Sequence, residues 1–218
     1  MQGRAPSRSG GLIETPTKLM PERDPKKFAP ARASTLDAAE REQYLPASKL
    51  VALLELKGGE TVLDYGAGTG RLALAAAAAI PHGRIVAVDE SAEMLAHLQH
   101  RLGGTANAEV ALISANRVPL RDGEADRILA VNLLHEVRGE GALSEMRRIL
   151  APDGILLVVD WERGRPRPGG PPDQLLYTAA EATSELCSAG FETTEIAAGL
   201  PFHFVIRATP PPTAQKPG

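Results

Sequence analysis

The sequence has few cysteines and aromatic residues and no excess of positive charge. Its 218 residues include one cysteine, Cys187, which excludes a disulfide framework and a thiolate-rich zinc site, so we expect no metal. Lys and Arg total 24 against 27 Asp and Glu, a balance unlike that of a dedicated nucleic-acid-binding protein, and we expect no DNA partner. Four Phe, three Tyr and one Trp provide few surfaces for stacking unpaired bases.

No apolar run is long enough to cross a bilayer. The longest, Leu72–Ile80, is about half the length of a membrane-spanning helix and consists mostly of alanine. The N-terminal residues are charged and lack the apolar block of a secretory signal. We therefore expect no membrane span, and the single cysteine suits a reducing, cytoplasmic location.

Composition divides the chain into one domain with two tails. Residues 1–27 are rich in Gly, Ser, Pro and Arg, and residues 209–218 contain four prolines, so both segments are predicted to be disordered. The domain between them, residues 28–208, has an internal loop at 162–172 with four prolines and three glycines, which excludes a helix or a central strand there.

Apolar strands alternate with helices of about ten residues, which predicts an α/β fold. A doubly wound, mostly parallel seven-stranded sheet is expected, with an antiparallel hairpin formed by the last two strands. Besides a helix that begins at Leu45-Pro46 and ends at Gly58-Gly59, helices are expected at Arg71–Ile80, Ser91–Leu102, Gly141–Leu150 and Ala179–Ser188. Strands are expected at Thr61–Tyr65, Arg84–Val88, Val110–Ile113, Asp126–Val131, Ile155–Val159, Glu192–Ala197 and Phe202–Ala208, with a turn at Pro152–Gly154 before the fifth.

Each of the first five strands ends in polar residues. In a parallel sheet the carboxyl ends of the strands meet at one edge, where ligands bind. A polar crevice is therefore predicted at that edge. It would contain Asp64, Asp89, Ser114–Asn116, Asn132 and Asp160.

A glycine-rich turn follows the first strand. In Asp64-Tyr65-Gly66-Ala67-Gly68-Thr69-Gly70, glycines allow a tight turn and let a ligand lie against bare main chain at the start of a helix. Asp89 follows 19 residues after Gly70, the spacing of a carboxylate that accepts hydrogen bonds from ribose hydroxyls. A dinucleotide site instead requires G-x-G-x-x-G and a pyrophosphate, beside which Asp64 would be unfavourable.

The pattern D-x-G-x-G-x-G followed by a strand ending in Asp resembles the class I S-adenosylmethionine-dependent methyltransferases, with a Rossmann-like fold, over about Tyr44–Ala208. The resemblance implies that Gly66, Gly68 and Gly70 lie against the methionine part of S-adenosylmethionine. It also implies that Asp64 contacts the amino group of the cofactor and that Asn132 lies beside the transferable methyl.

The adenosine end of the cofactor is assigned by the same resemblance. Asp89 would accept the ribose hydroxyls, and Glu90 and Met94 would flank the ribose and adenine, although Met94 also suits core packing. Many family members have an acidic residue after the third strand; here Asn116 occupies that region and would act through its amide oxygen.

The segment Asn132–Val137 resembles the small-molecule branch of the family, whose prokaryotic members include a group of undefined substrate. His135 is the best candidate for a general base, because imidazole titrates near neutrality; the alternative is a structural histidine at a helix start. Glu136 and Asp160 are weaker candidates. The expected acceptor is a small or medium-sized molecule.

Two other functions remain open from the sequence. One is methylation of RNA or a protein, with the basic N-terminal tail and the arginines Arg163, Arg165 and Arg167 as docking surface; the other is a non-catalytic cofactor-binding or interaction module. The arginine loop is either a lid that attracts an anionic acceptor or a solvated loop. By analogy with the resembling proteins, residues 28–45 are expected to form a lid over the cofactor.

Overall fold

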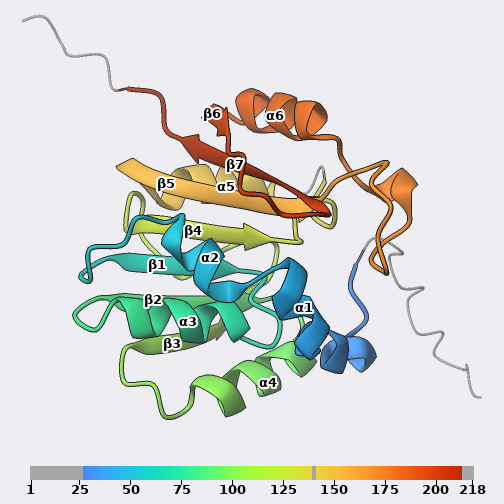
Figure 1. Cartoon of the computed structure of the whole chain (residues 1–218). Helices are drawn as coiled ribbons and strands as arrows, with labels where there is room; N and C mark the ends of the chain where they lie inside the picture. Colours follow the sequence, from blue (N-terminus) through green and yellow to red (C-terminus); the bar gives the residue numbers. More distant parts are fainter. Residues whose placement is uncertain (1–26, 139–140, 213–218) are drawn as a thin grey trace, which may run out of the picture.

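The computed structural model describes residues 27–138 and 141–212, which form one seven-stranded sheet covered by helices on both faces (Figure 1). The strand order is β3-β2-β1-β4-β5-β7-β6. Strands β1 to β5 are parallel, and β7 is antiparallel to both β5 and β6, so the predicted fold class is confirmed. The strands are β1 Thr61–Tyr65, β2 Arg84–Asp89, β3 Ala108–Leu112, β4 Ala125–Val131, β5 Leu150–Trp161, β6 Glu192–Glu195 and β7 His203–Thr209.

The helices form two layers around the sheet. Helices α2, α3 and α4 pack on one face, and α5 and α6 pack on the other (Figure 1). Neighbouring residues such as Val62 and Leu63 belong to different core clusters, because successive side chains of a strand point to opposite faces. The elements are η1 Pro30–Leu36, α1 Ala39–Tyr44, α2 Ala47–Ala52, α3 Arg71–Ala79, α4 Ala92–Leu102, α5 Ala142–Ile149, η2 Asp173–Leu175 and α6 Ala179–Ser188.

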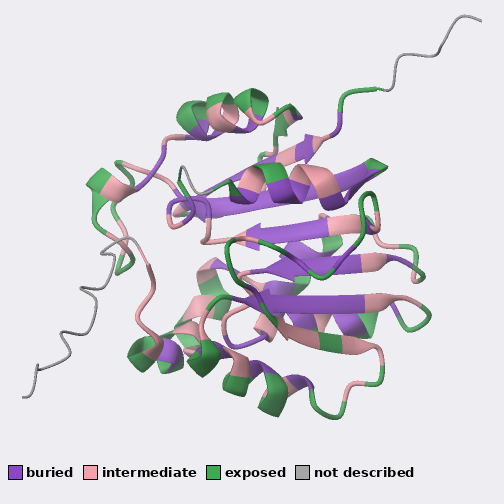
Figure 2. Ribbon diagram, turned by 180° about the vertical axis from the view of Figure 1, so that it is seen from behind, coloured by how far each residue is buried: buried purple, intermediate pink, exposed green. Residues whose placement is uncertain are grey.

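Local sequence explains where these helices begin. The Ser91 hydroxyl accepts a hydrogen bond from the Met94 amide and caps α4. Thr178 and Glu181 form a reciprocal capping box at the start of α6. Figure 2 shows the result: the central strands are buried, while exposed residues lie on the outer faces of the helices and in the loops.

Two predicted elements differ clearly from the structure, whereas the bounds of the others agree to within two residues. The helix expected from Leu45-Pro46 to Gly58-Gly59 is only α2, and Pro46 is its N-cap rather than a residue of its first turn. The turn expected at Pro152–Gly154 lies inside the long strand β5, at a register shift opposite Ala125 and Arg127. An irregularity of this kind lets the strand absorb Pro and Gly without ending its pairing.

The predicted tails lie largely outside the described residues, which exclude 1–26 and 213–218. Strand β7 includes Thr209, one residue beyond the expected end of the domain. The carboxyl ends of the parallel strands, η1, α1 and the 162–172 loop all lie on the right-hand side of Figure 1. Within the described ranges, no helix combines the length and apolarity needed to cross a membrane.

Candidate functional site

The glycine loop between β1 and α3 has the backbone geometry that its sequence predicts. Gly66, Gly68 and Gly70 have φ angles of 74°, 56° and 81°, a region that side chains rarely tolerate. At Gly70 an added Cβ would lie 2.9 Å from Leu98 Cδ2, so this glycine also allows α4 to pack closely against the loop. At Gly66 an added Cβ would lie 2.7 Å from Leu133 Cδ1. The loop after β4, which contains Leu133, therefore packs closely against the glycine loop.

Asp89, the last residue of β2, holds the glycine loop in place. One carboxylate oxygen accepts a hydrogen bond from the Gly68 amide at 3.0 Å, and the other accepts from the Ser91 amide at 2.9 Å. The residue is 9% exposed, and burial raises the pKa of its carboxyl above the usual value. The side chain therefore faces the glycine loop.

A pocket of about 330 Å³ lies between the ends of β2 and β3. Glu90 and Asn116 line it, whereas Met94 is buried and absent from its lining. The Asn116 amide oxygen, which the sequence assigned to an adenine amino group, accepts a hydrogen bond from the Tyr65 hydroxyl at 3.1 Å. The remaining lining residues are Ser91, Ile113, Ser114 and Ala115.

Two buried oxygen acceptors lack a partner at the ends of the adjacent strands β1 and β4. Asp64 Oδ2 and Asn132 Oδ1 make no hydrogen bond to any described residue. Burial raises the pKa of Asp64 to about 7, and the nearby charge of Asp89 adds to this effect. Asn132 also has a φ of 55°, a left-handed conformation that is uncommon for a residue with a side chain.

These features fit the methionine end of S-adenosylmethionine. A cationic donor would satisfy the two acceptors and favour the ionised form of Asp64. The bare peptide of the glycine loop lies beside Asp64, and the pocket at β2 and β3 has the location expected for the adenosine.

The segment before α2 lies across this region. The Asp37 carboxylate accepts a hydrogen bond from the Thr69 hydroxyl at 2.8 Å and pairs with Arg101 at 2.6 Å. Lys27 pairs with Glu90 at 2.9 Å. An added Cβ at Gly68 would lie 3.1 Å from Leu36 Cδ1, so Leu36 packs over the glycine loop. Residues 27–37 thus contact the glycine loop and the pocket rim.

His135 forms a buried pair with Asp160 at the ends of β4 and β5. Its Nδ1 lies 2.8 Å and 3.0 Å from the two Asp160 oxygens, and its amide donates to Asp160 Oδ2 at 3.0 Å. Burial disfavours the imidazolium, but the carboxylates of Asp160 and Glu136 together outweigh burial, so the pKa of His135 is raised. Burial also raises the pKa of Glu136 to about 7, and Glu136 Oε1 lies 3.8 Å from His135 Nε2.

Sequence reasoning missed an aromatic cluster beside this pair. Trp161 follows Asp160 on β5, and its register partner on β7 is His203. The rings of Tyr44 and Phe202 pack against them, with centroid distances of 5.8 Å and 6.4 Å to Trp161. The signal available in the sequence was weak, because only the pairing of β5 with β7 brings residues more than 40 positions apart together.

Comparisons with known proteins agree with this geometry. A family model described as "Methyltransferase domain" matches residues 62–154. The malonyl-[acyl-carrier protein] O-methyltransferase of Geobacter sulfurreducens is 30% identical over 182 residues, which are 75% of this chain and 68% of the relative. A ubiquinone/menaquinone biosynthesis C-methyltransferase of Syntrophotalea carbinolica is 34% identical over 112 residues, or 50% of this chain and 47% of the relative.

A solved structure shares the fold. The crystal structure of a SAM-dependent methyltransferase from Aquifex aeolicus superposes with a TM-score of 0.78 at 28% identity. The match covers 84% of this chain and 98% of that one. The chain therefore belongs to the class I S-adenosylmethionine-dependent methyltransferases, and S-adenosylmethionine is its methyl donor.

Proposed function

We propose that the protein methylates a small-molecule acceptor that enters at the β4–β5 side of the cofactor. The proposal rests on one observation: the functional residues form two groups at different strands along the carboxyl edge of the sheet. Asp64, Asp89 and the pocket of about 330 Å³ lie at β1 to β3, whereas the buried His135–Asp160 pair and the aromatic cluster lie at β4, β5 and β7. The relatives support an acceptor group of small size, since one is named for malonyl-[acyl-carrier protein] and the other for the biosynthesis of ubiquinone and menaquinone.

We assign the cofactor contacts as follows. Asp64 and the Asn132 amide oxygen receive the ammonium group, and the glycine loop supports the methionine chain. Asp89 accepts the ribose hydroxyls while its oxygens remain bonded to the loop amides. Glu90 and Asn116 border the adenine, and Met94 supports the pocket from the core.

S-adenosylmethionine supplies an electrophilic methyl group on a positively charged sulfur. A lone pair of the acceptor forms the new bond to the methyl carbon as the carbon–sulfur bond breaks, and that electron pair stays on sulfur. The protein accelerates this displacement by aligning the acceptor and excluding water. If the acceptor atom carries a proton, His135 Nε2 receives it, because Asp160 keeps the other ring proton on Nδ1.

The arginine loop gives little support to an RNA or protein acceptor. Arg163 pairs with Glu181, Arg165 with Glu162 and Arg167 with Asp173. These ion pairs neutralise the positive charge that would attract a phosphate backbone or an acidic protein.

The test is to incubate the protein with S-adenosylmethionine labelled in its methyl group and with size-fractionated cell extract. We expect label to appear in small molecules. Label confined to RNA or to protein would overturn the small-acceptor proposal. No heat in a titration with S-adenosylmethionine or its demethylated product would instead favour a non-catalytic scaffold.

The assignment of Asp64 predicts that cofactor binding releases protons. Because burial raises the pKa of Asp64 to about 7, part of the carboxyl population is protonated at pH 7. The ligand ammonium favours the carboxylate, so binding at pH 7 should release a fraction of a proton per ligand, and affinity should rise with pH around neutrality. Calorimetry in two buffers with different ionisation enthalpies measures this release.

Two variants test whether Asp64 is the group that releases the proton. In Asp64→Asn the release should disappear and the affinity should become independent of pH over this range. In Glu136→Gln, which removes another carboxyl with a pKa of about 7, the release should persist. Unchanged proton release in Asp64→Asn would show that another group titrates and that the ammonium does not lie at Asp64.

A further inference from the structure

Tyr44, Trp161, Phe202 and His203 form a compact group of packed rings next to the His135–Asp160 pair. The Trp161 and His203 ring centroids lie 4.2 Å apart, and Tyr44 stacks on His203 with an angle of 11° between the rings. Tyr44 also contacts Phe202 edge-on at 5.5 Å. Tyr44 and Phe202 are partly exposed, whereas Trp161 and His203 are buried, so the cluster meets solvent at Tyr44 and Phe202.

His203 carries two buried polar atoms without a protein partner. The residue is 3% exposed, and neither Nδ1 nor Nε2 has a hydrogen-bond partner among the described residues. Burial lowers the pKa of His203 to about 3, so the ring is neutral and carries one donor and one acceptor. Buried polar atoms without a hydrogen-bond partner lower the stability of the folded protein, and a ligand that forms a hydrogen bond to the ring would remove this destabilisation.

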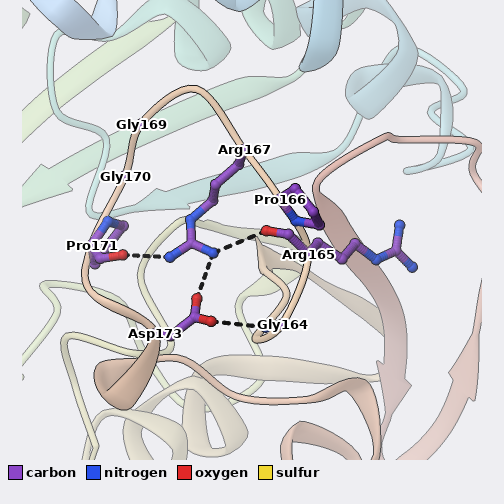
Figure 3. A pocket seen from close by; sticks show the side chains of 8 residues that line it. All are labelled: Gly164, Arg165, Pro166, Arg167, Gly169, Gly170, Pro171 and Asp173. Atoms are coloured by element: carbon purple, nitrogen blue, oxygen red, sulfur yellow. Dashed lines mark hydrogen bonds and ion pairs between the residues drawn. The ribbon is translucent and has the colours of Figure 1, made fainter.

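The charges of Arg165 and Arg167 in the 162–172 loop also act on His203, but both guanidinium groups already have protein partners. The loop borders a pocket of about 440 Å³, but Figure 3 shows the Arg167 guanidinium turned into its own loop. It donates to the Pro171 carbonyl at 2.6 Å and the Arg165 carbonyl at 3.2 Å, and it pairs with Asp173 at 2.6 Å (Figure 3). Arg165 is likewise paired with Glu162. These arginines stabilise the loop.

Arg41 is the cation near the cluster that lacks an ion pair with any described residue. It lies on α1, one helical turn before Tyr44, and its charge acts on His203. Burial lowers the pKa of Arg41, and the neighbouring charge of Arg71 lowers it further. Asp37 also influences Arg41, but its carboxylate is already bonded to Thr69 and Arg101. A partly desolvated guanidinium in this setting favours an anion.

We propose that the methyl acceptor is a planar monoanion, an aromatic or conjugated carboxylate, that packs on the aromatic cluster, places its negative group at Arg41 and hydrogen-bonds to His203. This inference rests on the proposed function, because it assigns the acceptor class of the same site. Arg41, which has no ion pair with a described residue, provides one positive charge beside the aromatic rings, and this charge matches one negative charge on a flat apolar molecule.

The protein contains a single tryptophan, so the fluorescence of Trp161 reports directly on the cluster. The protein is first loaded with S-adenosylhomocysteine, and loading is verified by calorimetry. Cinnamate and cinnamamide, which have the same shape but different charge, are then titrated while Trp161 fluorescence is followed. We expect cinnamate to bind about tenfold to a hundredfold more tightly than cinnamamide.

Variants identify the source of this preference. Arg41→Gln should bind the two probes equally, whereas Arg41→Lys should keep part of the preference for cinnamate. Arg121→Gln removes an exposed arginine from the loop between β3 and β4 and should behave as wild type. His203→Phe keeps an aromatic ring but should weaken binding of cinnamate, and its thermal unfolding is measured to verify folding.

The outcomes separate this inference from the proposed function. If S-adenosylhomocysteine binds but cinnamate and cinnamamide bind equally to wild type, the acceptor class proposed here is wrong and the methyltransferase proposal stands. If Arg41→Gln keeps the preference for cinnamate, Arg41 is not the anion contact and the inference is overturned. If S-adenosylhomocysteine itself does not bind, the proposed function fails, and this inference fails with it.

Discussion

Replacing Asp89 with Ala is expected to weaken binding of S-adenosylhomocysteine by about a hundredfold or more, because each hydrogen bond to a charged group contributes about 1.5–3 kcal/mol and two ribose hydroxyls lose their acceptor. The Gly68 and Ser91 amides lose their acceptor as well, so the glycine loop is less firmly held. Isothermal calorimetry of the folded variant measures the loss, and circular dichroism verifies that the fold is retained.

A control is needed because the substitution also affects the loop. Asp153→Ala removes an exposed carboxylate at the opposite end of β5 and should bind as wild type. The 2′-deoxy form of S-adenosylhomocysteine then isolates the ribose contact: it should bind more weakly than the parent ligand to wild type but equally well to Asp89→Ala. Affinity of Asp89→Ala within threefold of wild type would exclude the ribose assignment.

Replacing His135 with Gln is expected to lower kcat by about 10²- to 10⁴-fold, the contribution typical of a general base, when the acceptor proton must leave during the reaction. Affinity for S-adenosylhomocysteine should change little, because His135 lies at β4 and β5 rather than at the glycine loop. The assay is single-turnover transfer of labelled methyl to the acceptor fraction found by labelling of extract.

The matched control for His135 is His82→Gln, which removes an exposed histidine at the turn before β2, at the other end of the sheet. It should have wild-type kcat. Asp160→Asn should mimic His135→Gln in kcat, because Asp160 fixes the tautomer and orientation of the ring. Wild-type turnover by a folded His135→Gln variant would make His135 a structural residue that holds the ends of β4 and β5 together.

Much of the fold follows from local patterns in the sequence. Apolar strands, glycine stops and capping residues such as Ser91 predict the order and type of the elements, because these signals act over a few residues. The prediction was wrong where longer-range pairing overrides a local signal. At Pro152–Gly154 the residues of a turn lie inside β5, since pairing with β4 continues on both sides of the irregularity.

The glycine loop and Asp89 were also accessible from the sequence, since the motif and its spacing depend on one βαβ unit. The contact of Asp89 with the Gly68 amide then follows from the parallel pairing of β1 and β2. Asn116 shows the limit of this reasoning: its position was predicted, but the bond of its amide oxygen to Tyr65 was not.

The sequence alone determined the fold class and the donor cofactor, because both depend on contiguous motifs, and the same motifs predict that the cofactor lies at the carboxyl edge of the sheet. Only the tertiary structure gives the geometry on which the proposed acceptor side rests. There the pairing of β5 with β7 joins Trp161 to His203, and α1 adds Tyr44 and Arg41. Burial sets the titration of Asp64, Glu136 and His203 and cannot be read from neighbours along the chain, because it results from packing between distant segments.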